Sequence, residues 1–195
     1  MSFSIPNKVS IRLMSGGHSF SAAEISRGVK SDDGSFVVEL VTPKTTLVPQ
    51  ETFSEDVAAE YLAMMGLAPS LLEVVVFSPV VDGRVAVMAI NRECFAHLSL
   101  TYGDAVTFVS PLILGSAPEE GVLLELLGDV LYVRIYKGGL LFAEALEVRN
   151  DEDLLYAVTR INEVYHIYNM RVRAKGDVDR LKKPFKNLFT DLVCE

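Results

Sequence analysis

Tryptophan is absent from this chain, and cysteine and histidine are scarce. The 195 residues include two cysteines, Cys94 and Cys194, and three histidines. Two cysteines so far apart form neither a disulfide framework nor a metal-site spacing, so we expect two free thiols in a reducing cytoplasm. None of His18, His97 and His166 belongs to a metal-binding signature. The sequence therefore predicts no metal ligand and no catalytic residue.

The chain also has fewer basic than acidic residues. Lysine and arginine number 18 against 26 aspartates and glutamates, which leaves a formal charge of −8 at pH 7. A nucleic-acid-binding surface or an anionic membrane surface attracts an excess of basic residues. The charge balance therefore argues against nucleic acid as a general partner.

The chain lacks an uninterrupted apolar run. A membrane-spanning helix needs about 20 consecutive, mostly apolar residues. The longest apolar zone, Leu71 to Ile90, is broken by several polar residues, a proline and a glycine. The N-terminus does not have the basic-then-apolar order of a secretory signal. We therefore expect a protein that does not insert into a membrane and works in the cytoplasm.

What the sequence does contain is a clear pattern of strands from Val122 to Val148. Three β-like runs are joined by glycine-containing turns, and the middle run alternates with a period of two. Leu131, Val133 and Ile135 fall on one side of this middle strand. Tyr132, Arg134 and Tyr136 fall on the other side, where they form either an exposed interaction surface or a face covered by a helix of the same half.

The first part of the chain predicts a similar three-strand meander. Lys8 to Met14 and Ser19 to Ile25 flank a hairpin turn, and Phe36 to Val41 is a third strand that stops at a proline. Thr45 to Thr52 is expected to be an irregular connection. A helix capped by Ser54 should follow.

The remaining elements repeat this order in each half. The first half continues with strands at Glu73 to Phe77 and Arg84 to Ile90, a helix capped by Asn91, and a strand at Asp104 to Val109. The second half continues with a helix from Asp151, a strand at Met170 to Lys175, a helix at Asp177 to Phe189 and a short strand at Leu192 to Cys194. The segment from Leu112 to Glu120 is rich in turn-forming residues and predicts a boundary. We expect two lobes, 1–115 and 116–195.

This element order predicts an α+β, mixed-sheet fold. The order βββαβαβ is the plan of the ribonuclease-H-like fold, and two such lobes in tandem make the actin-like ATPase architecture. An ordinary α+β domain is the alternative.

The chain also resembles a family of bacterial proteins of unknown function with an actin-like fold. The distinctive piece is Thr42 to Phe53, which reads TPKTTLVPQETF. Further matches are Lys8 to Leu13 with the turn that follows, the helix from Asp56 to Met64, and weaker pieces at Ser110 to Ile113 and Tyr132 to Leu141. The resemblance implies a two-lobed actin-like fold and no established activity.

Actin-like ATPases hold nucleotide phosphates with a glycine-rich hairpin turn from each lobe, and an aspartate holds Mg²⁺. The corresponding turns here are Ser15-Gly16-Gly17 and Gly128-Asp129, and neither has the usual Asp-x-Gly pattern. Gly176 stands where these ATPases have a small-residue turn near the adenosine. These are the candidate cofactor-binding residues, although turn formation alone also explains each of them.

A ribonuclease-H-type nuclease is a further alternative, because it needs several carboxylates that converge on two metal ions. The candidates are Glu125, Glu144, Glu147 and Asp151. The acidic net charge disfavours a nucleic-acid substrate.

The C-terminal region is basic within an acidic protein. Its basic residues are Arg171, Arg173, Lys175, Arg180, Lys182, Lys183 and Lys186. They form either a site for an acidic partner or a solvated face that balances nearby acids.

The sequence favours a non-catalytic actin-like binding or assembly module with an unidentified protein partner and no cofactor. The alternative is a divergent ATP-binding ATPase or kinase-like enzyme, in which ATP and Mg²⁺ would be cofactors.

Overall fold

The structure, a computed structural model, describes residues 9–14, 34–185 and 188–195. The chain splits into two compact units, Met1–Leu114 and Gly115–Glu195. The first unit combines helices with one parallel and one antiparallel sheet, and the second combines helices with a mixed sheet, which confirms the predicted α+β, mixed-sheet class.

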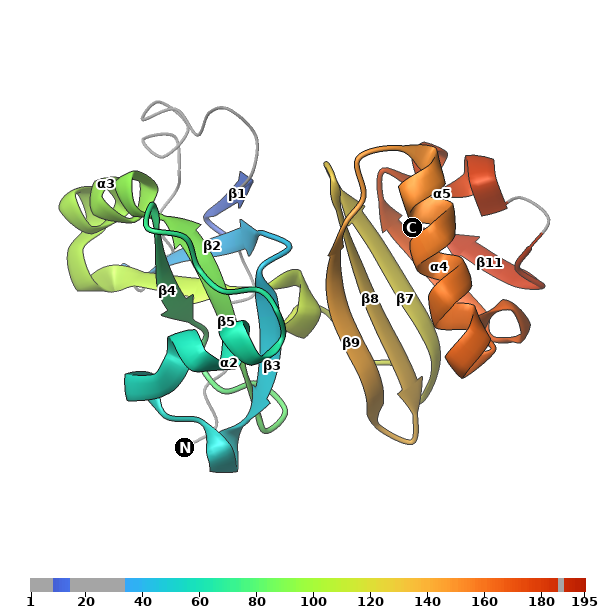
Figure 1. Ribbon diagram of the computed structural model, residues 1–195, viewed down its shortest axis with the longest axis horizontal. Coiled ribbons are helices and arrows are strands. Elements are labelled where there is room, and N and C mark those ends of the chain that lie inside the picture. The colour runs from blue at the N-terminus through green and yellow to red at the C-terminus, as the bar shows by residue number, and fades with distance from the viewer. Residues whose placement is uncertain (1–8, 15–33, 186–187) are drawn as a thin grey trace. The chain divides into compact units, whose positions relative to one another are not determined.

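The first unit contains two small sheets, a helix α2 and a helix α3 (Figure 1). Its strands are β1 Ile11–Met14, β2 Phe36–Val41, β3 Thr45–Pro49, β4 Glu73–Phe77, β5 Arg84–Asn91 and β6 Val106–Val109. Its α-helices are α2 Ala58–Met64 and α3 Arg92–Tyr102. The sheets have the strand orders β1-β2-β6 and β3-β5-β4.

The meander predicted for the start of the chain is wrong in its strand arrangement. Strands β1 and β2 are direct parallel neighbours, with Ile11 opposite Val38 and Met14 opposite Val41, so no third strand lies between them. All six residues of β2 are buried, as expected for a central strand in a parallel set. The segment predicted as the second strand, Ser19 to Ile25, lies outside the described residues.

The irregular connection predicted from Thr45 to Thr52 is also wrong, because its first part is strand β3. This strand pairs antiparallel with β5, with Thr45 opposite Met88 and Pro49 opposite Arg84. Proline is tolerated here because β3 is at the edge of its sheet and Pro49 is the last residue of the strand.

The second unit has the predicted βββαβαβ order. Its elements are β7 Glu120–Leu127, β8 Val130–Lys137, β9 Leu140–Glu147, α4 Asp151–Tyr165, β10 Arg171–Gly176, α5 Val178–Phe185 and β11 Asp191–Cys194. They form one five-stranded sheet with the order β11-β10-β7-β8-β9. The central β7 pairs parallel with β10 and antiparallel with β8. It therefore joins the antiparallel part of the sheet to the parallel part.

The core of the second unit lies between this sheet and its two helices. Leu131, Val133 and Ile135 are buried on the helix-covered face, as their alternation predicts. They pack in one cluster with apolar residues of α4 and α5, among them Val158 and Leu181. Burial of this continuous apolar face is the main stabilising contribution in the unit.

The other side of strand β8 is the face that α4 and α5 do not cover. Tyr132, Arg134 and Tyr136 are only 1%, 4% and 7% exposed. The Arg134 guanidinium lies 4.0 Å from the carboxylate of Glu125 on the neighbouring strand β7. The alternative that a helix of the same half covers these three side chains is therefore wrong, and their role as an interaction surface stays a prediction.

No helix in the described ranges combines the length and the apolar character that crossing a membrane requires.

Candidate functional site

The candidate cofactor-binding residues of the second unit lie together at one end of its sheet. Gly128 and Asp129 form the turn between β7 and β8, and Gly176 ends the neighbouring strand β10. Gly176 is in register with Leu126, and the Asp177 N–H donates to the Leu126 carbonyl oxygen over 2.9 Å. The other predicted turn, Ser15-Gly16-Gly17, lies outside the described residues.

Turn conformation explains one of these glycines and close packing explains the other. Gly128 has a φ of 57° in a two-residue turn between the paired Leu127 and Val130. A positive φ at the first turn residue alone is the type II′ pattern, which favours glycine there. At Gly176, with a φ of 79°, an added Cβ would lie 2.0 Å from the Leu126 carbonyl oxygen. The approach of β10 to β7 therefore requires a glycine.

The guanidinium of Arg180, on helix α5, binds the β7–β8 turn. It donates to the Gly128 carbonyl oxygen and to the Asp129 carboxylate, each over 3.1 Å. Its other terminal nitrogen donates to the Val148 carbonyl oxygen over 2.8 Å. The Arg180 side chain is only 20% exposed, and the Asp177 carboxylate accepts its backbone N–H over 3.0 Å.

Asp151 extends this network to the start of helix α4. Its carboxylate lies 3.9 Å from the Arg180 guanidinium and accepts a hydrogen bond from the Lys183 ammonium over 2.8 Å. That hydrogen bond lowers the pKa of Asp151 and raises the pKa of Lys183 from their ordinary values. Arg180 and Lys183 of α5 thus bind the β7–β8 turn and the start of helix α4.

In this half of the predicted site, the acid and a turn carbonyl already have partners within the protein. The carboxylate that could serve the metal, Asp129, is already paired with Arg180, and the Gly128 carbonyl accepts from the same guanidinium. A bound phosphate would have to compete with both contacts. Across the described ranges, no three histidine, cysteine or acidic side chains are grouped so as to hold a metal ion.

The four carboxylates considered for a nuclease do not converge. Glu125 is opposite Tyr132 and Glu144 is opposite Val133, so the two glutamates lie on opposite faces of the sheet. Glu147 is paired with a surface arginine, and Asp151 belongs to the network described above. This arrangement contradicts a two-metal nuclease site.

Most of the basic C-terminal residues balance acids of the same unit. Arg171 lies 3.7 Å from Asp191, and Arg173 and Lys175 lie 3.8 and 2.9 Å from Glu195. The contacts of Arg180 and Lys183 have the same effect. Of the other two basic residues, Lys182 is exposed and Lys186 lies outside the described side chains. The geometry favours a charge-balancing surface over a site for an acidic partner.

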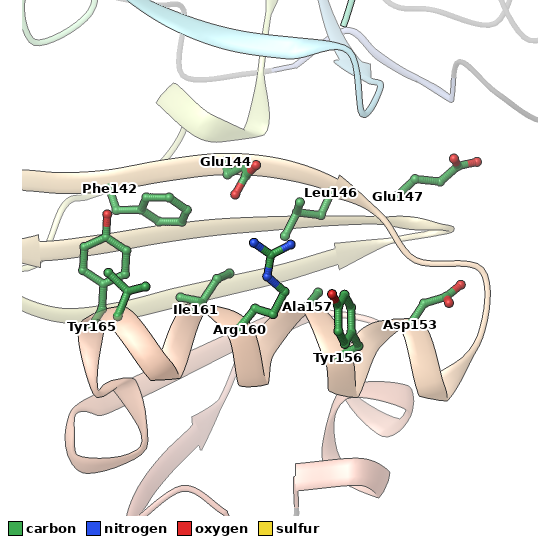
Figure 2. A pocket seen from close by; sticks show the side chains of 11 residues that line it. Phe142, Glu144, Leu146, Glu147, Asp153, Tyr156, Ala157, Arg160, Ile161 and Tyr165 are labelled. Atoms are coloured by element: carbon green, nitrogen blue, oxygen red, sulfur yellow. The ribbon is translucent and has the colours of Figure 1, made fainter. Parts of the chain in front are cut away.

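A groove between strand β9 and helix α4 is a feature that the sequence interpretation missed (Figure 2). Its volume is about 450 Å³. From β9 it is lined by Phe142, Glu144, Leu146 and Glu147, and from α4 by Asp153, Tyr156, Ala157, Arg160, Ile161, Val164 and Tyr165. Its signal in the sequence was the alternation of Phe142, Glu144 and Leu146, which places all three on the side of β9 that faces the helix.

Two opposite charges face each other in this groove. Figure 2 shows Arg160 extending from α4 toward β9, where Glu144 lies. Burial raises the pKa of Glu144, and the positive charge of Arg160 partly opposes that rise. The Arg160 guanidinium also lies 5.8 Å from the centre of the Tyr156 ring, within cation–π range. The groove therefore combines an apolar lining with a half-buried acid.

Comparison with known proteins gives a fold and no activity. No protein-family model matches the chain, and no curated protein matches it. Among solved structures, it is similar to a Bacteroides thetaiotaomicron protein with an actin-like ATPase fold and unknown function. The TM-score is 0.68 at 16% identity, over 85% of this chain and 72% of that one. The chain therefore has the actin-like ATPase fold, and the predicted resemblance to proteins of unknown function with this fold is confirmed.

A second similar structure is the cytoplasmic domain of EpsL, an inner membrane component of the type II secretion system of Vibrio cholerae. The TM-score is 0.39 at 18% identity, over 83% of this chain and 65% of that one. This likeness is too weak to support an inference about the chain.

Proposed function

We propose that this protein is a non-catalytic binding or assembly module that uses the actin-like ATPase fold without its nucleotide chemistry. The observation that carries the proposal is the binding of the β7–β8 turn by Arg180. In an actin-like ATPase, the corresponding turn holds phosphate with backbone N–H groups. Here the turn has only two residues, and its carbonyl and carboxylate oxygens are directed to a side chain of the protein itself.

Electrostatics supports this proposal. A phosphate at the turn would lie beside the negative charge of Asp129, and its attraction to Arg180 would be reduced because that guanidinium already has acidic and carbonyl partners. Moving Arg180 away would break an exposed hydrogen bond to Gly128 and a partly buried one to the Val148 carbonyl oxygen, and the loss of the buried one is the more costly. Nucleotide binding at this turn would therefore work against the stability of the second unit.

A reducing, cytoplasmic location is part of the same proposal. Cys94 and Cys194 are both free thiols, and Cys94 is buried. Burial raises the pKa of Cys94 to about 12, so its reactive thiolate form is suppressed at neutral pH. Two unpaired cysteines are typical of a protein in a reducing compartment.

The second candidate is a divergent ATP-binding enzyme. It is favoured by one observation, namely that Gly128, Asp129 and Gly176 come together at the end of the sheet where the fold would place them around a nucleotide. Under this alternative, Arg180 would release the turn and bind phosphate itself.

Isothermal titration calorimetry of the full chain with Mg·ATP distinguishes the two. We expect no saturable heat at millimolar nucleotide and no change in melting temperature. The wild-type protein should be compared with Asp129→Ala, which removes the carboxylate from the turn, and with Glu147→Ala, which removes an exposed paired carboxylate elsewhere in the unit. Saturable Mg·ATP binding that Asp129→Ala weakens and Glu147→Ala leaves intact would overturn the non-catalytic proposal.

A further inference from the structure

Strand β9 is a long edge strand with few of the features that usually protect an edge. It is the last strand of its sheet, and its eight residues, LLFAEALE, contain no proline, lysine or arginine. The opposite edge strand, β11, has only four residues. Proteins usually protect exposed edges with prolines, lysines or short strands, because the unpaired backbone groups are a template for another strand.

The register shows which backbone groups of β9 face away from the sheet. The Val148 N–H donates to the Asp129 carbonyl oxygen over 2.8 Å, and the antiparallel pairing continues from there to Ile135 and Phe142. Hydrogen-bonded and non-hydrogen-bonded pairs alternate along such a ladder. The backbone groups of Phe142, Glu144 and Leu146 therefore point to β8, and those of Ala143 point outward.

The accessible part of this edge is its first half. Leu141 is 55% exposed and Ala143 is half-buried, whereas Ala145 is buried. The pairing shifts at this point, since Ile135 is opposite Phe142 and Tyr136 is opposite Leu140, so Leu141 is the extra residue of a β-bulge. An added strand would therefore pair with β9 at Ala143, next to the exposed bulge residue Leu141.

Such a strand would run directly beside the groove between β9 and α4. Successive side chains of a strand point to opposite faces of a sheet, so every second side chain of an added strand would lie over the groove. Peptide recognition by strand addition works in this way, since the backbone supplies hydrogen bonds and pockets for alternate side chains supply specificity. Two apolar side chains of α4 that line the groove, Tyr156 and Val164, are also 64% and 67% exposed.

The charges of the groove select a basic occupant. Three of its lining residues are acidic and one is basic. Glu147 already pairs with Arg149 over 3.1 Å, and Asp153 accepts the Arg149 backbone N–H over 3.1 Å, so both rim acids have partners. Glu144 is half-buried and faces Arg160 without a salt bridge between them among the described residues. A basic side chain over Glu144 would complete its neutralisation.

A second copy of this chain is a poorer occupant. If two β9 strands paired across a two-fold axis, each would present the same residues to the other, and β9 contains no basic residue. Glu144 would gain no counter-charge from its copy. The charge pattern therefore favours a different protein.

We propose that a partner protein adds an extended segment to the outer edge of β9, with a basic side chain over Glu144 and apolar side chains on either side of it in the groove. This inference rests on the proposed role as a binding module, and it identifies the surface and the chemistry of the partner segment.

The direct test uses a defined peptide and the full chain labelled with ¹⁵N. The probe alternates threonine with the groove-facing order valine–lysine–valine, and the matched probe has glutamate in place of lysine. At millimolar peptide we expect amide shifts in β9 at Leu141 and Ala143 and in α4 at Ala157 and Arg160. The glutamate probe should bind at least roughly tenfold more weakly, because it opposes the charge of Glu144.

Two variants test the two parts of the interaction separately. Ala143→Pro removes an outward N–H while leaving the bonds between β8 and β9 intact, and it should weaken binding of the lysine probe roughly tenfold. Glu144→Gln should weaken the lysine probe and remove the difference between the two probes. Glu152→Gln, on an exposed part of α4 away from the groove, is the matched control and should change neither. The dispersion of the amide spectrum shows that each variant is folded.

The proposal is overturned if neither probe shifts the β9 amides at millimolar concentration, or if Glu144→Gln leaves the preference for lysine unchanged. It is also overturned if sedimentation shows a dimer that Ala143→Pro dissociates, since a second copy would then occupy the edge. The Mg·ATP titration reports independently on the proposed function. A chain that binds neither ATP nor peptide loses this inference only, whereas one that binds both loses the non-catalytic role.

Discussion

Gly176 has no room for a side chain. The end of β10 approaches β7 so closely that the Asp177 N–H reaches the Leu126 carbonyl oxygen over 2.9 Å. A side chain at Gly176 would meet that same oxygen, and the left-handed backbone conformation adds strain for any other residue. The position that the sequence marked as a candidate nucleotide contact is thus fully explained by packing of the sheet.

We predict that Gly176→Ala destabilises the protein by about 3 kcal/mol or more, because it combines backbone strain with a clash against a main-chain oxygen. Gly138→Ala is the matched control, since Gly138 also has a positive φ, 66°, but an added Cβ meets nothing within 4 Å. It should cost about 1 kcal/mol. Urea unfolding measures both values, and equal losses would show that the close approach to Leu126 is not restrictive.

Helix α3 shows how reliably a local signal predicts the start of an element. The Asn91 side chain accepts hydrogen bonds from the backbone N–H groups of Glu93 over 2.8 Å and Cys94 over 3.3 Å, as its place before an apolar-periodic segment predicts. Ser54 was predicted to cap the preceding helix in the same way. Its side chain makes no capping hydrogen bond, and the segment after it begins as a 3₁₀ turn. Both positions look alike in the sequence and only one of them caps.

We expect Asn91→Ala to lower the free energy of unfolding by about 1 kcal/mol, because two N–H groups of the first helical turn lose their acceptor. Ser54→Ala removes a residue of the same class without breaking a capping bond, and it should have almost no effect. Thermal unfolding of the two variants beside the wild type makes the comparison. Equal shifts in Tm would contradict the assignment of Asn91 as the cap.

Strand boundaries were less predictable than caps. Thr45, Thr46 and Val48 are β-branched and suit a strand, but Pro43 and Pro49 on either side suggested a loop. Pairing with β5 makes this segment a strand. Pro49 is tolerated because, at the edge of the sheet, no backbone hydrogen bond from this residue is needed. In the same way, the six-residue run of β2 reads as the end of a meander locally, and only its burial between β1 and β6 makes it a central parallel strand.

At the scale of the whole second unit, Arg180 joins parts of the chain that are far apart in sequence. Its contacts reach the β7–β8 turn at Gly128, the end of the β9 segment at Val148 and the start of α4 at Asp151. One side chain of α5 therefore holds a turn, the end of the β9 segment and the start of a helix in place. The same contacts occupy the turn at which an actin-like ATPase would bind phosphate.

Arg180→Ala should destabilise the protein by about 2 kcal/mol, because the Gly128 and Val148 carbonyl oxygens lose hydrogen bonds from a mostly buried charged donor. Arg149→Ala is the control, because Arg149 is 73% exposed and its ion pair with Glu147 lies at the surface. That variant should unfold as the wild type does. Chemical unfolding of both gives the comparison, and similar behaviour of the two variants would show that Arg180 is not structurally important.

The sequence by itself determined the order of elements in the second unit, the turns at Gly128 and Gly176, and the cap of α3. These depend on backbone conformation and on periodicities of a few residues, which are local properties. The tertiary structure alone decided that β1 and β2 are parallel neighbours and that α4 and α5 pack on the Leu131 face of β8.

The contacts that bear on function also depend on the folded chain. Arg180 and Gly128 are 52 residues apart, and Glu144 and Arg160 meet only because α4 packs along β9. The periodicity of apolar residues in the sequence does not reveal such pairs, because they form when distant elements pack against one another. The sequence could therefore predict an actin-like fold, whereas only the packed structure shows that a guanidinium occupies the turn and that a groove lies open beside an edge strand.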